Sequence, residues 1–156
     1  LCTTGLSGEQ IEKIDEVADR FFGIGGNNGW FYADKLWQIR GFMDKMVGGV
    51  GMERGRRSET DIQAGEVLDF WRVLLADRKN HRLLLFAEMK IPGEAWLEFS
   101  IVKSKNHCIL KQIATFRPQG ILGRNYWYAM LPFHYFIFRN MLKRIAGVEP
   151  ESKREK

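Results

Sequence analysis

The sequence has few residues that could form covalent or metal cross-links. It contains two cysteines, Cys2 and Cys108, neither of them in a Cys-x-x-Cys pair, and three histidines that lie far apart. Two cysteines cannot build a disulfide framework, and the histidines match no metal-ligand spacing. We therefore expect reduced thiols, no metal site and a cytoplasmic location.

The sequence also lacks a long uninterrupted hydrophobic run. Its most apolar stretch, Ile121 to Phe138, is broken by Arg124, Asn125, Pro132 and His134. Because a membrane-spanning helix requires about twenty mostly apolar residues, we expect no membrane span. No signal peptide is expected either.

Composition and charge are ordinary for one globular domain. The 156 residues are 45% hydrophobic and 28% charged, with a net charge of +5 that is dispersed along the chain. The aromatic residues follow the periodicity of a core instead of standing exposed beside basic residues, so we expect no nucleic-acid partner. We predict a single domain over residues 1–147 and a charged, flexible tail over 148–156.

Two helices are predicted in the first third of the chain. Ser7 to Phe22 has apolar residues at helical period, and Ser7 and Gln10 have the spacing of a capping box. A second helix is predicted from Ala33 to Val47. The glycine-rich segment between them, Gly23 to Gly29, follows a helix, whereas a dinucleotide-binding loop follows a strand. We interpret it as a structural turn.

The period of the hydrophobic residues shifts to two after residue 66, which predicts strands. The four predicted strands are Val67–Leu75, Arg82–Ile91, Glu94–Lys103 and Cys108–Phe116. Their short connections imply an antiparallel meander. A long helix, Gly120–Ala146, follows and is expected to be kinked or split at Pro132. The predicted fold class is α+β, with two shorter helices at one end of a curved antiparallel sheet and the long C-terminal helix across its concave face.

Acidic residues in the central hairpin raise the question of a polar anchor inside the domain. With a two-residue turn at 92–93, Ala87 would lie opposite Glu98 and Glu88 opposite Leu97, which puts one carboxylate on each face of the sheet. Each glutamate either points to water or lies in an apolar cavity. An arginine is expected to pair with one of them, the candidates being Arg40, Arg57 and Arg72.

Seven ordered motifs give the sequence a family resemblance. They are Gly29-Trp-Phe-Tyr32, Leu36-Trp37 with Arg40-Gly41, Val47-Gly-Gly-Val-Gly51, Arg54-Gly-Arg-Arg57, Gly65-Glu-Val-Leu-Asp-Phe-Trp-Arg-Val73, Ala87-Glu-Met-Lys-Ile-Pro-Gly-Glu-Ala-Trp96, and Phe116-Arg-Pro-Gln-Gly-Ile-Leu-Gly-Arg124 leading into Tyr126-Trp-Tyr-Ala-Met-Leu-Pro-Phe-His134. The chain resembles the uncharacterised domain found C-terminal to atypical short-chain dehydrogenase domains, in proteins often labelled nucleoside-diphosphate-sugar epimerases.

The resemblance implies a fold similar to the helix-grip fold of the START and birch-pollen-allergen superfamily, which encloses an apolar ligand between a curved sheet and a long helix. It implies no catalytic residues. NAD(P) would be bound only by the nucleotide-binding domain, which this chain does not contain. The first strand of the helix-grip fold could come only from Leu1–Leu6, which leaves open a sheet that lacks one edge or is completed by another chain.

We therefore expect a non-catalytic binding domain for a small apolar or amphipathic ligand, accessory to a dehydrogenase-like domain. The predicted ligand-binding residues are Trp30, Trp37, Arg40, Asp69, Trp71, Arg72, Glu88, Trp96, Glu98, Tyr126 and Phe133. One alternative is an interaction or dimerisation module that uses the aromatic C-terminal helix. A third hypothesis is an enzyme that uses a carboxylate in the binding cavity.

Overall fold

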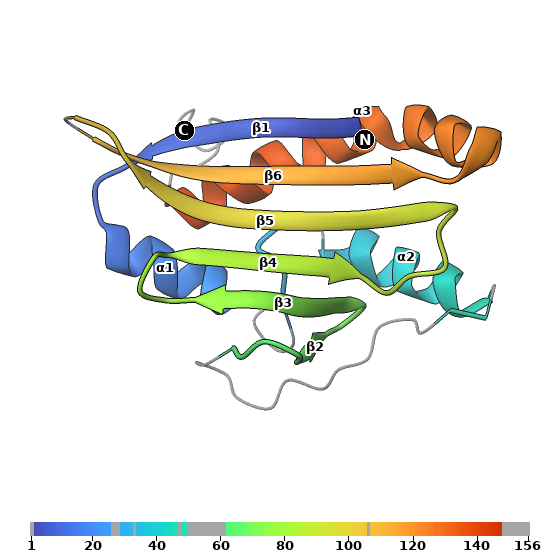
Figure 1. Cartoon of the computed structure of the whole chain (residues 1–156), viewed down its shortest axis with the longest axis horizontal. Helices are drawn as coiled ribbons and strands as arrows, with labels where there is room; N and C mark the ends of the chain where they lie inside the picture. The colour runs from blue at the N-terminus through green and yellow to red at the C-terminus, as the bar shows by residue number, and fades with distance from the viewer. Residues whose placement is uncertain are drawn as a thin grey trace, which may run out of the picture.

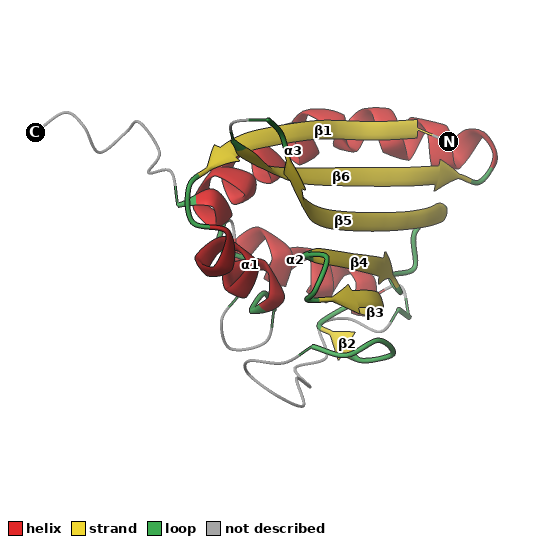
Figure 2. Ribbon diagram, turned by 60° about the vertical axis from the view of Figure 1, so that its left-hand side comes forward, coloured by secondary structure: helices red, strands yellow, loops and turns green. Residues whose placement is uncertain are grey.

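A computed structural model describes residues 2–25, 29–32, 34–46, 48–49, 62–105 and 107–147. Its elements, in chain order, are β1 (Cys2–Ile11), α1 (Ile14–Phe22), α2 (Asp34–Met46), β2 (Val67–Leu68), β3 (Trp71–Asp77), β4 (Arg82–Ala87), β5 (Gly93–Lys103), β6 (Cys108–Pro118) and α3 (Gly120–Ala146). The helices lie on one side of a single sheet, which gives two layers (Figures 1 and 2). The predicted segment 54–57 and the tail from residue 148 lie outside the described residues.

The sheet has six antiparallel strands in the order β1-β6-β5-β4-β3-β2. Strands β2 to β6 form a meander, in which each strand pairs with the next along the chain. β1 joins the meander beside the last strand, where Ile11 pairs with Cys108 and Cys2 with Phe116. The α+β class, the antiparallel sheet and the long C-terminal helix packed on it are confirmed.

The predicted first helix was placed too early in the sequence. α1 begins at Ile14, and the backbone of Ser7 and Gln10 belongs to β1, where they pair with Gln112 and Ile109. A capping-box spacing is a local signal, and pairing with β6 satisfies the same backbone groups from a distance. β1 therefore supplies the edge strand that the sequence left open.

The predicted strand Val67–Leu75 is two strands joined by a tight turn. β2 pairs back onto β3, with Leu68 opposite Trp71, so that the chain reverses at Asp69 and Phe70. Asp69 makes this possible because its backbone adopts φ 56°, a left-handed conformation that aspartate tolerates better than most residues.

The register of the central hairpin differs from the predicted one by three residues. Leu84, and not Ala87, lies opposite Glu98, and Leu85 lies opposite Leu97. The connection is the five-residue segment 88–92 instead of a two-residue turn, because the backbone N–H of Glu88 donates to Phe70 O at 2.8 Å and thereby leaves the β4–β5 ladder. An odd shift exchanges the faces of one strand relative to the other.

The hydrophobic core lies between the helix-facing side of the sheet and the helices. Alternate residues of the central strands point into it, as the alternating burial along β4, β5 and β6 shows. Among its most deeply buried members are Phe21, Phe22, Leu83, Leu85, Leu97, Phe99, Leu110, Met141, Leu142 and Ile145. α3 packs along β1 and β6, near the edge of the sheet opposite to the edge formed by β2 and β3 (Figure 1).

α3 continues through Pro132 as one helix, so of the two predicted outcomes at that residue, a kink or a split, the split is wrong. It ends at Gly147, whose φ of 81° suits a glycine at the C-terminal cap. α1 is attached to this end by the side chain of Arg20, which donates to Ile145 O at 3.1 Å. Within the described residues, none of the helices has both the length and the apolar character that crossing a membrane requires.

α2 is held to the rest of the molecule by one narrow stripe. Among the residues of α2, only Trp37, Gly41 and Asp44 are buried. The carboxylate of Asp44 accepts the backbone N–H of Lys90 at 2.7 Å, which ties α2 to the connection between β4 and β5. Most of the remaining surface of the helix faces outward, including Phe42 and Met46.

Candidate functional site

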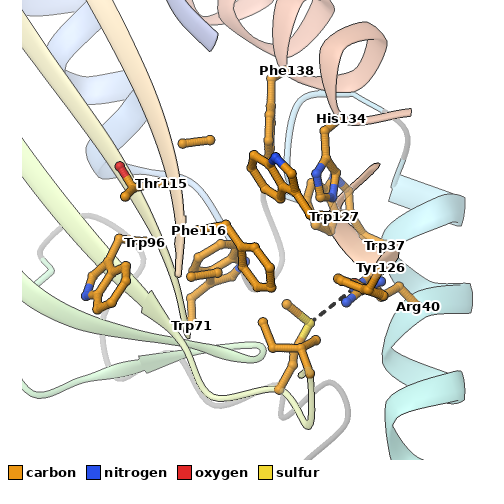
Figure 3. Close-up of a pocket in the computed structure, with 14 residues that line it drawn as sticks. Trp37, Arg40, Trp71, Trp96, Thr115, Phe116, Tyr126, Trp127, His134 and Phe138 are labelled. Carbon is orange, nitrogen blue, oxygen red and sulfur yellow. Dashed lines mark hydrogen bonds between the residues drawn. The ribbon is translucent and has the colours of Figure 1, made fainter. Parts of the chain in front are cut away.

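A small apolar cavity lies where α2, α3 and the sheet meet (Figure 3). Its volume is about 40 Å³. The residues that line it are Trp37, Arg40, Trp71, Met89, Ile91, Ala95, Trp96, Ala114, Thr115, Phe116, Tyr126, Trp127, His134 and Phe138. No aspartate or glutamate is among these residues. A space of this size holds roughly one to three water molecules and is smaller than the ~150 Å³ that accommodates benzene.

A cluster of aromatic rings forms one wall. The ring of Trp37 lies 5.6 Å from that of Trp30 and 5.7 Å from that of Phe70, and Phe70 lies 5.8 Å from Trp71. A buried hydrogen bond holds Trp30 in place, in which its indole N–H donates to Asp69 Oδ2 at 2.7 Å. Trp30 and Asp69 therefore support the cavity wall without lining the cavity.

Arg40 enters the site from α2 and has unusually weak partners. Its Nε donates to the sulfur of Met89 at 3.4 Å, its Nη1 lies 3.8 Å from the sulfur of Met130, and its guanidinium lies 5.4 Å from the ring centre of Tyr126. Thioether sulfur is a poor acceptor, and a guanidinium has five N–H donors. Among the described residues, no carboxylate lies within ion-pair distance of Arg40.

Three buried polar atoms around the cavity have no hydrogen-bond partner among the described residues. They are the indole nitrogens of Trp37 and Trp71 and the Nδ1 atom of His134. An unsatisfied buried polar group costs about 1–3 kcal/mol, and native proteins contain few of them. Other such atoms exist, among them both side-chain polar atoms of the buried Gln112, but here three of them surround one small space beside an arginine with sulfur partners.

The titratable groups of the site are held neutral. Burial, together with the smaller effect of the positive charge of Arg40, lowers the pKa of His134 to about 4. Burial raises the pKa of Tyr126, partly opposed by the nearby Arg40 guanidinium. At neutral pH the site therefore contains a neutral imidazole, a neutral phenol and one permanent positive charge.

A larger apolar groove lies between α2 and α3, next to the cavity. Its volume is about 170 Å³, and it is lined by Leu36, Trp37, Ile39, Arg40, Met43, Met130, Phe133, His134 and Ile137. Trp37, Arg40 and His134 line both spaces and form the partition between them. Several groove residues are open to solvent, among them Met43 with 60% and Phe133 with 59% of its surface exposed.

The structure brings together part of the predicted set of binding residues. Trp37, Arg40, Trp71 and Tyr126 lie around the cavity, and Phe133 lies in the adjoining groove. Trp96 borders the cavity, but its ring points to the other side of the sheet (Figure 3), where it packs on Phe86 at 5.6 Å.

The predicted polar anchors lie elsewhere. Arg72 forms an ion pair with Glu88, as expected for one of the three candidate arginines, and Arg82 binds Glu98 at 2.6 Å. Both pairs are on the face of the sheet away from the helices, since the residues that alternate with them in β3 and β5 are buried. They do not line the cavity or the groove described above.

Sequence reasoning missed Met89, Phe116, Trp127, His134 and Phe138. Trp127, His134 and Phe138 are spaced seven and four residues apart, which places them on one face of a helix, so this stripe could have been found. Met89 and Phe116 depend on the strand register and could not. Within the part of the chain that the structure describes, no group of three or more His, Cys, Asp or Glu side chains could hold a metal ion.

Fold and site together define a two-layer α+β domain with an apolar interior space beneath its long helix. The chain belongs to the family described as "Protein of unknown function (DUF2867)", which matches residues 6–141. A comparison with curated proteins found no significant match.

Two solved structures, both structural-genomics targets, match this chain. One, from Nitrosospira multiformis, is 8% identical with a TM-score of 0.52, and the alignment covers 98% of this chain and 99% of that one. The other, a solution NMR structure from Thermobifida fusca, is 14% identical with a TM-score of 0.48 over 94% and 95% of the two chains. At such identities the Nitrosospira protein shows a shared fold and nothing further.

Proposed function

We propose that this domain binds a small apolar or amphipathic ligand, without catalysing a reaction on it, in the space formed by the cavity and the α2–α3 groove. The observation that carries the proposal is the combination of an apolar lining with a few polar groups that have no good partner. Ligand sites are commonly apolar with a small number of placed polar groups. Here those groups are Arg40, His134 and the indoles of Trp37 and Trp71.

The ligand would occupy mainly the groove. The cavity alone, at about 40 Å³, is too small for an organic molecule, whereas the groove has about 170 Å³. Because Trp37, Arg40 and His134 separate the two spaces, a rotamer change of the Arg40 side chain would join them. The narrow attachment of α2 favours such a change.

The experiment that tests this proposal is native mass spectrometry of the purified chain, followed by titration with apolar probes monitored by tryptophan fluorescence. Phe133→Ala should weaken binding several-fold, because Phe133 lines the groove. Phe136→Ala is the matched control, since Phe136 is equally exposed at 59% but does not line the groove. A chain that releases no small molecule on unfolding and binds no apolar probe would contradict the proposal.

The sequence resemblance extends this proposal to a helix-grip relationship and to an accessory role beside an NAD(P)-dependent dehydrogenase-like domain. The antiparallel sheet with a long C-terminal helix supports the first part. The second part rests on the resemblance alone. Its test is whether adding the domain, with and without ligand, changes NAD(P)H oxidation by a separately purified dehydrogenase-like domain.

A second candidate function, dimerisation through the aromatic helix, is favoured by the exposed apolar residues of α3. These are Ile121, Leu122, Tyr128, Phe133, Tyr135 and Phe136, each with 59–77% of its surface exposed. Exposed apolar patches commonly mark interaction sites. A dimer in sedimentation experiments that dissociates on Leu122→Glu would support this function, and a monomer at high concentration would exclude it.

A further inference from the structure

We infer that the ligand of this site is a monoanionic amphipathic molecule, a carboxylic acid whose carboxylate binds Arg40 while its apolar part fills the α2–α3 groove. This inference rests on the proposed function and adds the chemical class of the ligand. It follows from the charges, the hydrogen-bonding capacity and the size of the two spaces.

The charge of the site favours one negative charge on the ligand. Among the described residues that line the cavity and the groove, Arg40 is the only permanently charged one. The nearby carboxylate of Asp44 lines neither space and accepts the backbone N–H of Lys90 at 2.7 Å. One guanidinium balances one carboxylate. A dianion such as a phosphate monoester would keep an uncompensated charge in an apolar environment, which is costly. A cationic head would meet Arg40 directly and be repelled.

The hydrogen-bonding groups favour acceptor oxygens. The Nε and Nη1 atoms of Arg40 point to the sulfur atoms of Met89 and Met130, at 3.4 and 3.8 Å, and a carboxylate is a much better acceptor than a thioether. The planar fork of a guanidinium binds both oxygens of a carboxylate at once. The indoles of Trp37 and Trp71, which are donors only, have no other partner among the described residues.

The size of the groove sets the apolar part of the ligand. At about 170 Å³ it is slightly larger than the ~150 Å³ that accommodates benzene. Arg40 lines one wall of the groove and also the cavity beyond it. A molecule with a phenyl-sized apolar group and an acid two or three bonds away would place its carboxylate at that wall.

The test uses four probes that share a phenyl group and a short linker and differ in their head: phenylpropanoate, phenylpropanol, phenylpropylamine and phenylethyl phosphate. Affinities for the full chain are measured by calorimetry at neutral pH. We expect phenylpropanoate to bind at least about tenfold more tightly than the alcohol, as for a charge-assisted hydrogen bond. The amine and the phosphate should bind more weakly than the carboxylate.

The matched variants are Arg40→Met and Arg139→Met. Arg139 is exposed on α3 and lies about 180° around the helix from the groove residues Met130, Phe133, His134 and Ile137. Arg40→Met should remove the preference for the acid over the alcohol, and Arg139→Met should retain it. If Arg40→Met does not fold, Arg40→Lys serves instead, because it keeps the charge, loses the fork and should bind the acid several-fold more weakly.

The outcomes separate the inference from the proposed function. Equal binding of all four heads, tighter binding of the phosphate, or a preference unchanged by the Arg40 variants would overturn the inference while the binding function stands. Failure of every probe to bind would overturn both. A localised readout is available, since the acid should shift the indole N–H resonances of Trp37 and Trp71 among the five tryptophans of the chain.

Discussion

Among single residues, His134 shows most directly how the interior of this domain controls charge. It is packed between the rings of Trp127 and Phe138, at 6.0 and 5.3 Å. Its folded-state pKa of about 4 is below the value of about 6.5 for an unfolded chain. The unfolded state therefore binds a proton first as the pH falls.

This difference makes stability depend on pH in a defined window. Stability is fully present above pH 6.5 and is lost as the pH falls from about 6.5 toward 4, by about 3 kcal/mol from this residue. His134→Phe should remove that loss, which thermal unfolding measured between pH 7 and pH 4 would show. His107→Asn is the control, because His107 is exposed. An unchanged pH profile for His134→Phe would contradict the prediction.

Single site residues were predictable where a helix or a sequence pattern fixed them. Trp37 and Arg40 lie three residues apart on α2, and Tyr126 lies on α3, so each reaches the site whatever the strand register. The position of Glu88 and Glu98 depended on a register that the hydrophobic pattern alone does not determine. The partners of Arg40 could not be predicted, because a hydrophobic pattern treats Met89 and Met130 as apolar core residues and not as hydrogen-bond acceptors.

Among the elements, α3 depends on one close approach to the sheet. Gly123 lies against the connection before β5, and the carbonyl oxygen of Pro92 there accepts the backbone N–H of Gln119 at 2.9 Å. A Cβ atom at position 123 would overlap Pro92 O and lie 3.0 Å from Pro118 Cβ. The first turn of α3 is thus fixed in place by the absence of a side chain.

Gly123→Ala should lower the free energy of unfolding by about 2 kcal/mol, even though alanine is the better helix former. Urea denaturation measures this change. Asn125→Ala, at an exposed position on the same helix, is the matched control and should change stability by less than about 0.5 kcal/mol. Equal or greater stability of Gly123→Ala would show that α3 can shift without cost.

The elements were predicted unevenly for a physical reason. Strands β4, β5 and β6 and helix α3 carry strong periodic patterns, and they appear at nearly the predicted positions. β1 contains two glycines, two threonines and a serine, and its pairing with β6 joins residues far apart in sequence. No local pattern encodes such a partner. The turn at Asp69 was not predicted, because apolar residues continue on both sides of this aspartate and the hydrophobic pattern does not reveal its left-handed backbone conformation.

For the whole molecule, the class of fold follows from the order of elements, whereas the site arises from their assembly. Helices, then a meander of strands, then a long helix allow few arrangements other than two layers. The cavity and the groove each require α2, α3 and the partition between them, which no single segment specifies. Their volumes therefore came only from the structure.

The pairing of β1 with β6 has a consequence for folding during synthesis on the ribosome. Ile11 pairs with Cys108, which is synthesised 97 residues later, so Ile11 has no sheet partner until then. At the usual pace of about 5–20 residues per second, synthesis leaves this segment without its neighbour for roughly 5 to 20 s. During that interval the β1 segment can be bound by chaperones or by other nascent chains. The last helix, which is synthesised after β6, can pack on the complete sheet only afterwards.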